Sequence, residues 1–216
     1  MTTLPTRVVA GITVPNTPLV NRALEYAREN LNDVAFNHVA RSWLLGQYIA
    51  DNNPEIKDRD IELQSVAAIL HDLGWSQNPK LISEDKRFEV DSANETVKFV
   101  IREGVKEEWD EHRLQLLWDA VALHTTVSIA VHKETEVKAC CVGILAEFVP
   151  LSETYGGVLT QQVWDTIVKD FPRTDFKEGV NEILCGLCRT KPITTYDNFV
   201  GDFGTAYLEG SSIPSI

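Results

Sequence analysis

The sequence predicts an all-α protein that folds as a compact helical bundle. Apolar residues recur at helical spacing in segment after segment, whereas strand-like alternation is confined to RVVAGITV at residues 7–14. Pro150 and Pro172 lie where two of these apolar periods end, as expected for a residue that cannot continue a helix. The 216 residues, 44% of them hydrophobic, suffice for one substantial core. We therefore expect a single helical domain at residues 18–216, preceded by an N-terminal arm at residues 1–17.

Each predicted helix rests on its own apolar period and on the residues that flank it. The predicted segments are residues 16–31, 33–53, 57–75, 91–103, 108–125, 134–149, 159–170, 176–190 and 196–208. Asp33 is a candidate N-cap of the second helix, because a short carboxylate can accept the free N–H groups of a first turn. Gly74 is the expected C-cap of the third helix. Residues 76–90 have no clear period and carry mixed charge, which predicts a loop.

Composition and charge exclude several classes of function. The net charge of −12 disfavours non-specific binding to nucleic acid, which requires clustered Lys and Arg. No stretch approaches the roughly 18 apolar residues of a membrane span, and the N-terminus does not resemble a secretory signal. We therefore expect a cytoplasmic protein with a small-molecule substrate and without nucleic-acid or membrane partners. A homo-oligomer is left open.

Four cysteines occur in two close pairs, Cys140 with Cys141 and Cys185 with Cys188. Their positions within predicted helices favour buried free thiols in a reducing compartment. The pair in CGLC could instead be half of a zinc or redox site, but no second pair of Cys or His residues lies nearby in the sequence. The structural interpretation is therefore preferred.

Four of the five histidines lie at or near the end of a predicted helix that has an apolar face. These four are His38, His71, His124 and His132, whereas His112 lies in a charged stretch and is expected at the surface. Any one of the four could be a helix cap or a core residue with its own hydrogen bonds. Four together favour metal ligation, because neutral imidazole is the commonest side-chain ligand of metal ions.

Two carboxylates strengthen this prediction. Glu147 is the only charged residue of the apolar segment ACCVGILAEFVP, and a buried carboxylate needs a metal ion or a cationic partner. We expect a metal ligand; the alternative is a salt bridge to an Arg or Lys elsewhere. Asp72 directly follows His71, so on a continuous helix the two side chains would point about 100° apart. Both can reach one ion that lies beyond the helix end; a simple helix cap is the alternative.

The ordered set of His38, then His71 with Asp72, then a late acid resembles the HD-domain superfamily of metal-dependent hydrolases over most of the chain. Within it the chain looks closest to the branch that contains cyanamide hydratase. The similar segments are FNHVARSWLLG, AAILHDLGW, RFEVD, ALHTTVSIAVHKETEV and KPITTYDNFVGDFG. Glu147 stands where the superfamily has its last Asp ligand, and FVPLSETYGG replaces the LDN motif of cyanamide hydratases.

The resemblance implies an HD-type fold, a divalent cation and a hydration reaction. The cation would be held by His38, His71, Asp72 and Glu147, with zinc favoured and with iron or manganese as alternatives. Metal-activated water would add to a nitrile-type carbon, which in the named branch converts cyanamide to urea. Asp72 or His124 would carry the proton.

The RFEVD segment carries a second implication of the resemblance. Lys86, Arg87, Glu89 and Asp91 cluster where a loop meets the next predicted helix, and they are candidates for a substrate-binding wall. The alternative is an ordinary charged helix N-terminus with Asp91 as its cap. The sequence supports both interpretations equally.

Three other functions are kept as alternatives. Some HD-domain proteins hold a second metal with two further histidines, so His124 and His132 could complete the site of a di-iron oxygenase; we favour one metal, with His124 in the substrate pocket. A phosphohydrolase acting on a nucleotide or small phosphate ester would need cations, and only Lys86, Arg87 and Lys133 are close to the candidate residues in sequence. The last alternative is a binding or scaffold protein whose metal is structural or lost.

Overall fold

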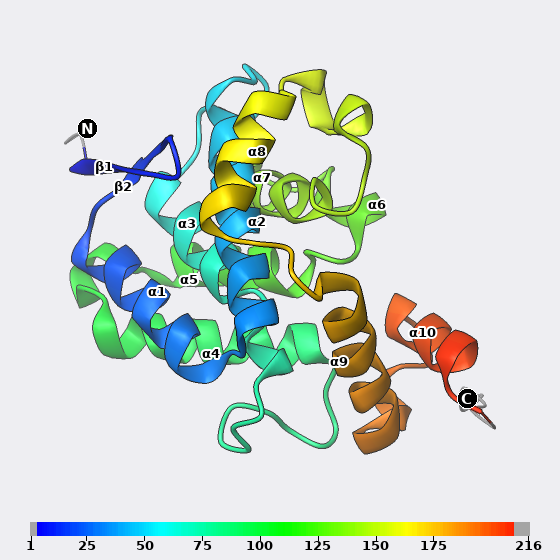
Figure 1. Cartoon of the computed structure of the whole chain (residues 1–216). Helices are drawn as coiled ribbons and strands as arrows, with labels where there is room; N and C mark the ends of the chain where they lie inside the picture. Colours follow the sequence, from blue (N-terminus) through cyan, green and yellow to red (C-terminus); the bar gives the residue numbers. More distant parts are fainter. Residues whose placement is uncertain (1–3, 210–216) are drawn as a thin grey trace.

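The computed structural model describes residues 4–209, which form ten α-helices and one β-hairpin (Figure 1). The helices are α1 (Pro18–Asn30), α2 (Asp33–Asp51), α3 (Ile61–Leu70), α4 (Phe88–Glu103), α5 (Glu111–Ala122), α6 (Val127–Ala130), α7 (Thr135–Leu145), α8 (Gln161–Asp170), α9 (Phe176–Thr190) and α10 (Phe199–Tyr207). The strands are β1 (Thr6–Val9) and β2 (Ile12–Pro15), and the short 3-10 turns are η1 (Leu73–Trp75), η2 (Lys106–Glu108), η3 (Leu151–Glu153), η4 (Tyr155–Gly157) and η5 (Pro192–Thr194). The predicted helical class is confirmed. None of the described helices is both long enough and apolar enough to cross a membrane.

The hairpin lies where the sequence shows its one strand-like segment. Ala10 and Gly11 join the antiparallel strands with φ angles of 45° and 78°, the left-handed conformation of a two-residue hairpin turn. Ile12 and Val14 are buried in the main core, because β2 packs on α2 and α3. Residues 6–15 of the predicted arm are therefore part of the packed structure.

Helix α2 is the central element of the bundle (Figure 1). Thirteen of its 19 residues are buried, and it packs against α3, α7, α8 and α9. It comes very close to α7 at Gly46 and Gly143, where a Cβ atom on Gly143 would lie 2.4 Å from the Gly46 Cα atom. Glycine at these positions lets the two helix backbones touch. The contact fixes α7, and the residues that follow it, against the helix that carries His38.

The N-terminal boundary of α2 differs by one residue from the prediction. Asn32 caps the helix, because its side-chain oxygen accepts the Ala35 N–H at 2.9 Å. The predicted cap, Asp33, is the first helical residue, and its carboxylate forms an ion pair with Arg28 at 2.6 Å on the surface. The asparagine side chain thus takes the capping position that the sequence analysis assigned to the aspartate.

Gly74 has a different role from the predicted helix cap. The helix α3 ends earlier, at Leu70, and Gly74 lies in the 3-10 turn η1. A Cβ atom on Gly74 would lie 2.2 Å from the carbonyl oxygen of Phe88, so glycine permits close contact with the first turn of α4. The helix α4 itself begins at Phe88, inside the segment predicted as a loop at residues 76–90.

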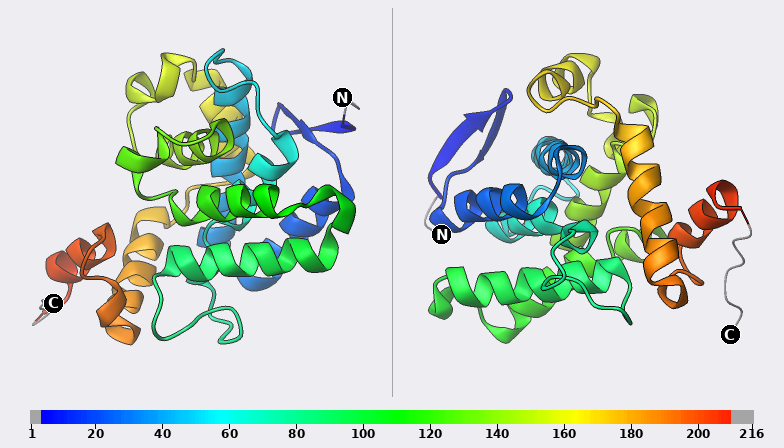
Figure 2. Two further views of the ribbon diagram at one scale, coloured as in Figure 1. Left: turned by 180° about the vertical axis from the view of Figure 1, so that it is seen from behind. Right: turned by 60° about the horizontal axis from the view of Figure 1, so that its bottom comes forward.

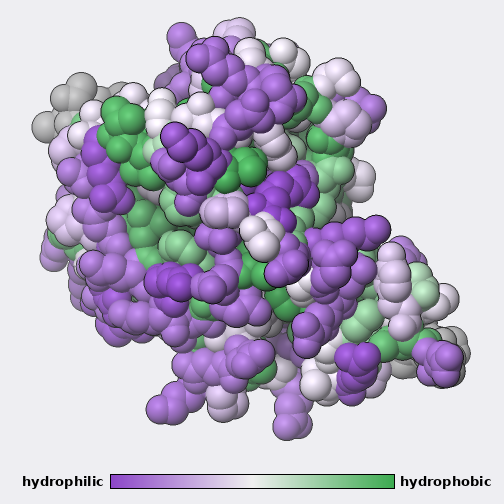
Figure 3. All heavy atoms as spheres, viewed as in Figure 1, coloured by the Kyte–Doolittle hydropathy of each residue, from purple (hydrophilic) through white to green (hydrophobic). Residues whose placement is uncertain are grey.

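The C-terminal helices α9 and α10 form a small unit at one end of the bundle. Figures 1 and 2 show them side by side, on the side of the molecule away from the hairpin. They pack through a second apolar cluster that is separate from the main core and is made of Phe88, Phe176, Val180, Leu184 and Val200. Hydrophilic side chains cover much of the face seen in Figure 3, as expected for an acidic protein.

We predict that Gly143→Ala destabilises the protein by about 1–3 kcal/mol, because the new methyl group would force α2 and α7 apart. Urea unfolding monitored by circular dichroism measures the effect. Gly186→Ala is the matched control: it lies in α9, and a Cβ atom there meets nothing within 4 Å. This control should be stabilised by about 0.5–1 kcal/mol through helix propensity alone. Equal stability of the two variants would contradict the close packing.

Candidate metal centre

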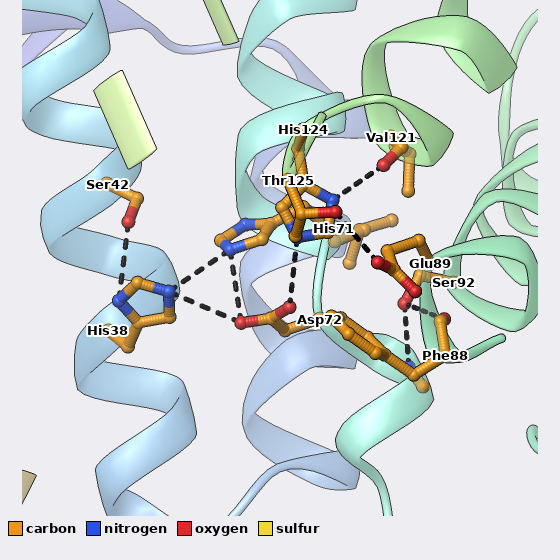
Figure 4. Close-up of polar contacts among 12 residues, drawn as sticks. His38, Ser42, His71, Asp72, Phe88, Glu89, Ser92, Val121, His124 and Thr125 are labelled. Atoms are coloured by element: carbon orange, nitrogen blue, oxygen red, sulfur yellow. Dashed lines mark hydrogen bonds and ion pairs between the residues drawn. The ribbon is translucent and has the colours of Figure 1, made fainter. Parts of the chain in front are cut away.

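Four polar side chains from three helices meet in the interior (Figure 4). His38 lies within α2, and His71 is the C-cap residue of α3. The backbone leaves the helical conformation at Asp72, with φ −110° and ψ 24°, so the side chains of His71 and Asp72 reach the same point. His124 follows the end of α5 and approaches Asp72 from another direction. The predicted convergence at a helix end is therefore present.

The nitrogen and oxygen atoms of this cluster are closely spaced. The Nε2 atoms of His38 and His71 are 3.2 Å apart, and they lie 3.3 and 3.1 Å from Oδ2 of Asp72. The Nε2 atom of His124 lies 3.5 Å from Oδ1, the other carboxylate oxygen of Asp72. All four residues are almost completely buried. One ion could contact His38, His71 and Asp72 together, because their ligand atoms all lie within 4.8 Å of one another.

The three imidazoles are oriented alike, with Nδ1 directed outward and Nε2 directed toward Asp72. The Nδ1–H group of His71 donates to the Ala68 carbonyl at 2.8 Å, and that of His124 donates to the Val121 carbonyl at 2.6 Å. A carbonyl oxygen can only accept, so each of these rings carries its proton on Nδ1 when neutral. Its Nε2 atom then presents a lone pair to the centre.

The N–H groups of His71 and His124 are directed away from Asp72. Neither carboxylate oxygen of Asp72 has a hydrogen-bond partner among the described residues, although the side chain is fully buried. A buried carboxylate beside several imidazole lone pairs is strongly unfavourable without a positive charge. Two imidazoles and a carboxylate are also a suitable donor set for a transition-metal cation. The residues present therefore fit a divalent metal ion.

In the metal-free protein a proton supplies part of this positive charge. Burial favours the neutral form of His38, but the nearby carboxylates of Asp72 and Glu147 favour the protonated form more strongly and raise its pKa to about 9. Burial lowers the pKa of His71. Burial would raise the pKa of Asp72, but the neighbouring imidazoles, His71 foremost, hold it well below its usual value. A metal ion must displace the proton from Nε2 of His38 to bind.

Glu147 lies on the far side of the His38 ring, which corrects the expectation that it would face the ion. Its Oε2 accepts the Nδ1–H of His38 at 2.5 Å, and Arg41 donates to both of its oxygens at 2.7 and 3.0 Å. Burial would raise the pKa of Glu147, but the hydrogen bonds from His38 and Arg41 outweigh it and lower that pKa. The salt bridge weighed as the alternative is thus present. Glu147 fixes the ring orientation of His38, as outer carboxylates do behind metal-binding histidines.

A cavity of about 230 Å³ opens onto the cluster. Its polar wall residues are His38, Asp72, His124 and Thr125, which all belong to the cluster or adjoin it. The other wall residues are apolar. They are Phe148 and residues of η1, α4, α6, α7, α9 and α10. Among residues 4–209, no lysine or arginine lines this cavity.

The RFEVD segment contributes one wall residue, Phe88, which was not among the four predicted. Arg87 donates to Glu89 at 2.7 Å, and the buried Glu89 also accepts the hydroxyl proton of Thr125 at 2.7 Å. Glu89 thus positions a wall residue without lining the cavity itself. Lys86 is exposed and is not among the lining residues.

Asp91 is neither a helix cap nor a wall residue. It lies within the first turn of α4, is buried, and pairs with the buried Lys191 at 2.7 Å. It also accepts the backbone N–H and the hydroxyl of Ser83. Asp91 therefore ties α4 to the loop before it and to the end of α9.

The remaining candidates lie outside the cluster. His132 and His112 are exposed. Lys133 forms ion pairs with Asp119 and Glu134. The structure therefore does not bring His132 to the position that a two-metal site would require. The four cysteines are free thiols, and three of them are buried.

The aromatic walls of the cavity were not among the predicted site residues. Trp75, Phe148, Phe199 and Phe203 line it, and the Trp75 ring stacks on His38 with the centroids 5.6 Å apart. Phe199 and Phe203 are one helical turn apart in the helix predicted at residues 196–208. That spacing was a signal for one apolar helix face, but it did not indicate what the face covers.

We predict that His71→Ala removes most of the bound metal, because it deletes one of the two imidazoles that can contact the same ion as Asp72. Elemental analysis of protein purified without chelators measures the metal content, and circular dichroism checks the fold. His132→Ala, on an exposed histidine, should keep the wild-type metal content. Loss of a second ion in the His132 variant would instead support a dinuclear site.

We also predict that metal binding releases protons. Below a pH of about 9 the His38 imidazole of the metal-free protein carries a proton on both nitrogens and is positively charged, whereas an imidazole that binds a metal ion must be neutral. The affinity for zinc should therefore rise with pH, by about tenfold per unit from this group alone. Calorimetric titration in two buffers of different ionisation enthalpy, at about pH 7.5, measures the release. Binding without proton release would contradict the assignment of His38.

The comparison with protein families agrees with this geometry. The family model described as HD domain matches residues 35–145, just over half of the chain, and this span contains His38, His71, Asp72 and His124. A search of curated proteins found no match. The matched model and the buried cluster support a metal-dependent hydrolase type without selecting a branch or a substrate. The chain belongs to the HD-domain family.

Proposed function

We propose that the protein is a metal-dependent hydratase or hydrolase that adds water to a small, uncharged substrate with a nitrile or related unsaturated carbon. The observation that carries this proposal is the cavity that ends on His38, Asp72 and His124 and has no cationic side chain in its described walls. Such a cavity suits a neutral molecule. Cyanamide, the substrate of the branch that the sequence resembles, is one member of this class.

A divalent cation, for which we propose zinc, would supply Lewis acidity and would lower the pKa of water toward about 7. His38, His71 and Asp72 would hold the cation. His124 lines the cavity, and its Nδ1–H is committed to Val121, so Nε2 is the atom that can take a proton from water. The same atom can pass that proton to the substrate nitrogen, which balances the addition of one water to one carbon–nitrogen triple bond.

Thr125 provides a second directional contact. Its hydroxyl proton is donated to Glu89, so its oxygen can only accept hydrogen bonds from a molecule in the cavity. An amide or urea product offers N–H groups that match this acceptor. Thr125 therefore favours a product that carries nitrogen-bound hydrogen.

The phosphohydrolase alternative has less support. A phosphate ester needs cationic side chains around its charged oxygens. None of the three candidate cations, Lys86, Arg87 and Lys133, lines the cavity. Each of them also forms an ion pair with a nearby carboxylate: Lys86 with Asp85, Arg87 with Glu89, and Lys133 with Asp119 and Glu134. The di-iron alternative relied on His132, which is exposed.

We predict that zinc-loaded protein converts nitriles or cyanamide to the corresponding amide or urea, measured by chromatography of the products. His124→Gln should lower kcat by about 100- to 10,000-fold while the metal content stays unchanged, because the proton carrier is lost. His132→Gln is the matched control and should keep wild-type activity. Release of phosphate from nucleotides without any hydration of nitriles would overturn the proposal.

A further inference from the structure

We infer that the substrate carries an uncharged planar apolar group of about the size of a benzene ring, which binds between α4 and the C-terminal helices α9 and α10. The identity of the reacting group rests on the proposed function, whereas the nature of the bound apolar group rests on the cavity alone. The inference selects among substrates: cyanamide, which has no apolar part, would leave most of the cavity unused.

The cavity walls are of two chemical kinds. One part carries the polar side chains of the candidate metal centre. The part contributed by α4, α9 and α10, which we term the apolar end, is built from Phe88, Val180, Leu184, Phe199 and Phe203, and it adjoins the polar part where the Phe88 ring contacts His124 with the centroids 5.7 Å apart. Asp72 is the only carboxylate among its described wall residues, and it belongs to the metal centre. A substrate must therefore present its reactive group to the polar end and an uncharged apolar group to the other.

The volume matches a ring plus a small reactive group. The cavity measures about 230 Å³. An apolar protein cavity of about 150 Å³ is large enough to bind benzene. The rest of the volume leaves room for a two-atom group such as a nitrile next to the metal centre.

The walls favour a planar ring over a branched alkyl group. The rings of Phe88 and Phe199 meet edge to face, with centroids 6.3 Å apart at 82°, and those of Phe199 and Phe203 do so at 6.1 Å and 85°. Aromatic rings prefer such edge-to-face or offset contacts with another ring. A substrate ring can extend this arrangement, whereas cyanamide cannot make these contacts.

Four of these five residues belong to the C-terminal unit, outside the span that matches the HD-domain family. The unit has its own small apolar cluster, although α9 also contacts α2. Substitutions in α9 and α10 can therefore change the shape of the apolar end while the metal centre stays in place. Val180, Leu184, Phe199 and Phe203 are thus specificity-determining residues.

The test compares benzonitrile, acetonitrile and cyanamide as substrates of the zinc-loaded protein, and it measures benzene binding separately by the shift of the melting temperature. We expect kcat/KM for benzonitrile to exceed that for acetonitrile by about tenfold or more, since even one methylene in an apolar pocket is worth about that factor. Leu184→Phe should fill the apolar end, lower kcat/KM for benzonitrile by about tenfold or more, and abolish the benzene shift.

Ile193→Phe, on an exposed residue outside the cavity, is the matched control. Phe203→Ala is a second variant, which should enlarge the apolar end and favour larger aromatic nitriles even if Leu184→Phe does not fold. Benzene binding that Leu184→Phe abolishes, without hydration of any nitrile, would support this inference and overturn the proposed function. Hydration of cyanamide alone, without benzene binding, would overturn this inference and support the proposed function. Absence of both would overturn both.

Discussion

Asp72 is a fully buried carboxylate whose oxygens receive no hydrogen bond from the described residues. Three imidazole Nε2 atoms lie within 3.5 Å of it. Such an arrangement is stable only with added positive charge, from a proton or from a metal ion. The helices α2, α3 and α5 must keep their relative positions for the four side chains to share that charge. The packing of the bundle and the binding of a cation are therefore coupled, and each depends on the other.

A second layer of charge lies behind the first. Arg41 and Glu147 form a buried ion pair that holds the Nδ1 side of His38. Arg41 also donates to the carbonyl groups of Phe171 and Pro172, just before α9 begins. The same guanidinium group thus connects the orientation of a candidate ligand with the place where the C-terminal unit starts. Removing one partner would leave the other charged and buried, a change that costs about 3–5 kcal/mol in comparable pairs.

The sequence carried most of the fold and part of the site. The convergence of His71 and Asp72 was predictable, because it depends on a local event, the end of α3. The burial of Glu147 was also predictable from its apolar neighbours, but its role was not. Arg41 lies one turn after His38 in α2, so both side chains reach the same carboxylate, and this spacing is visible in the sequence. Whether a buried acid meets a guanidinium group or a metal ion depends on contacts between distant segments, which periodicity does not encode.

The balance of charge supports the proposed hydration over the alternative of phosphate hydrolysis. Neutral His38 and His71 add no charge, and Asp72 cancels one of the two charges of a divalent cation, so the centre would keep one positive charge. Glu147 does not reduce it, because Arg41 already balances that carboxylate. One hydroxide ion makes the centre neutral, whereas a phosphate dianion would leave a negative charge against the apolar walls formed by Phe88 and the C-terminal helices. An uncompensated charge in such surroundings is costly. A neutral substrate attacked by hydroxide avoids that cost at every stage of binding.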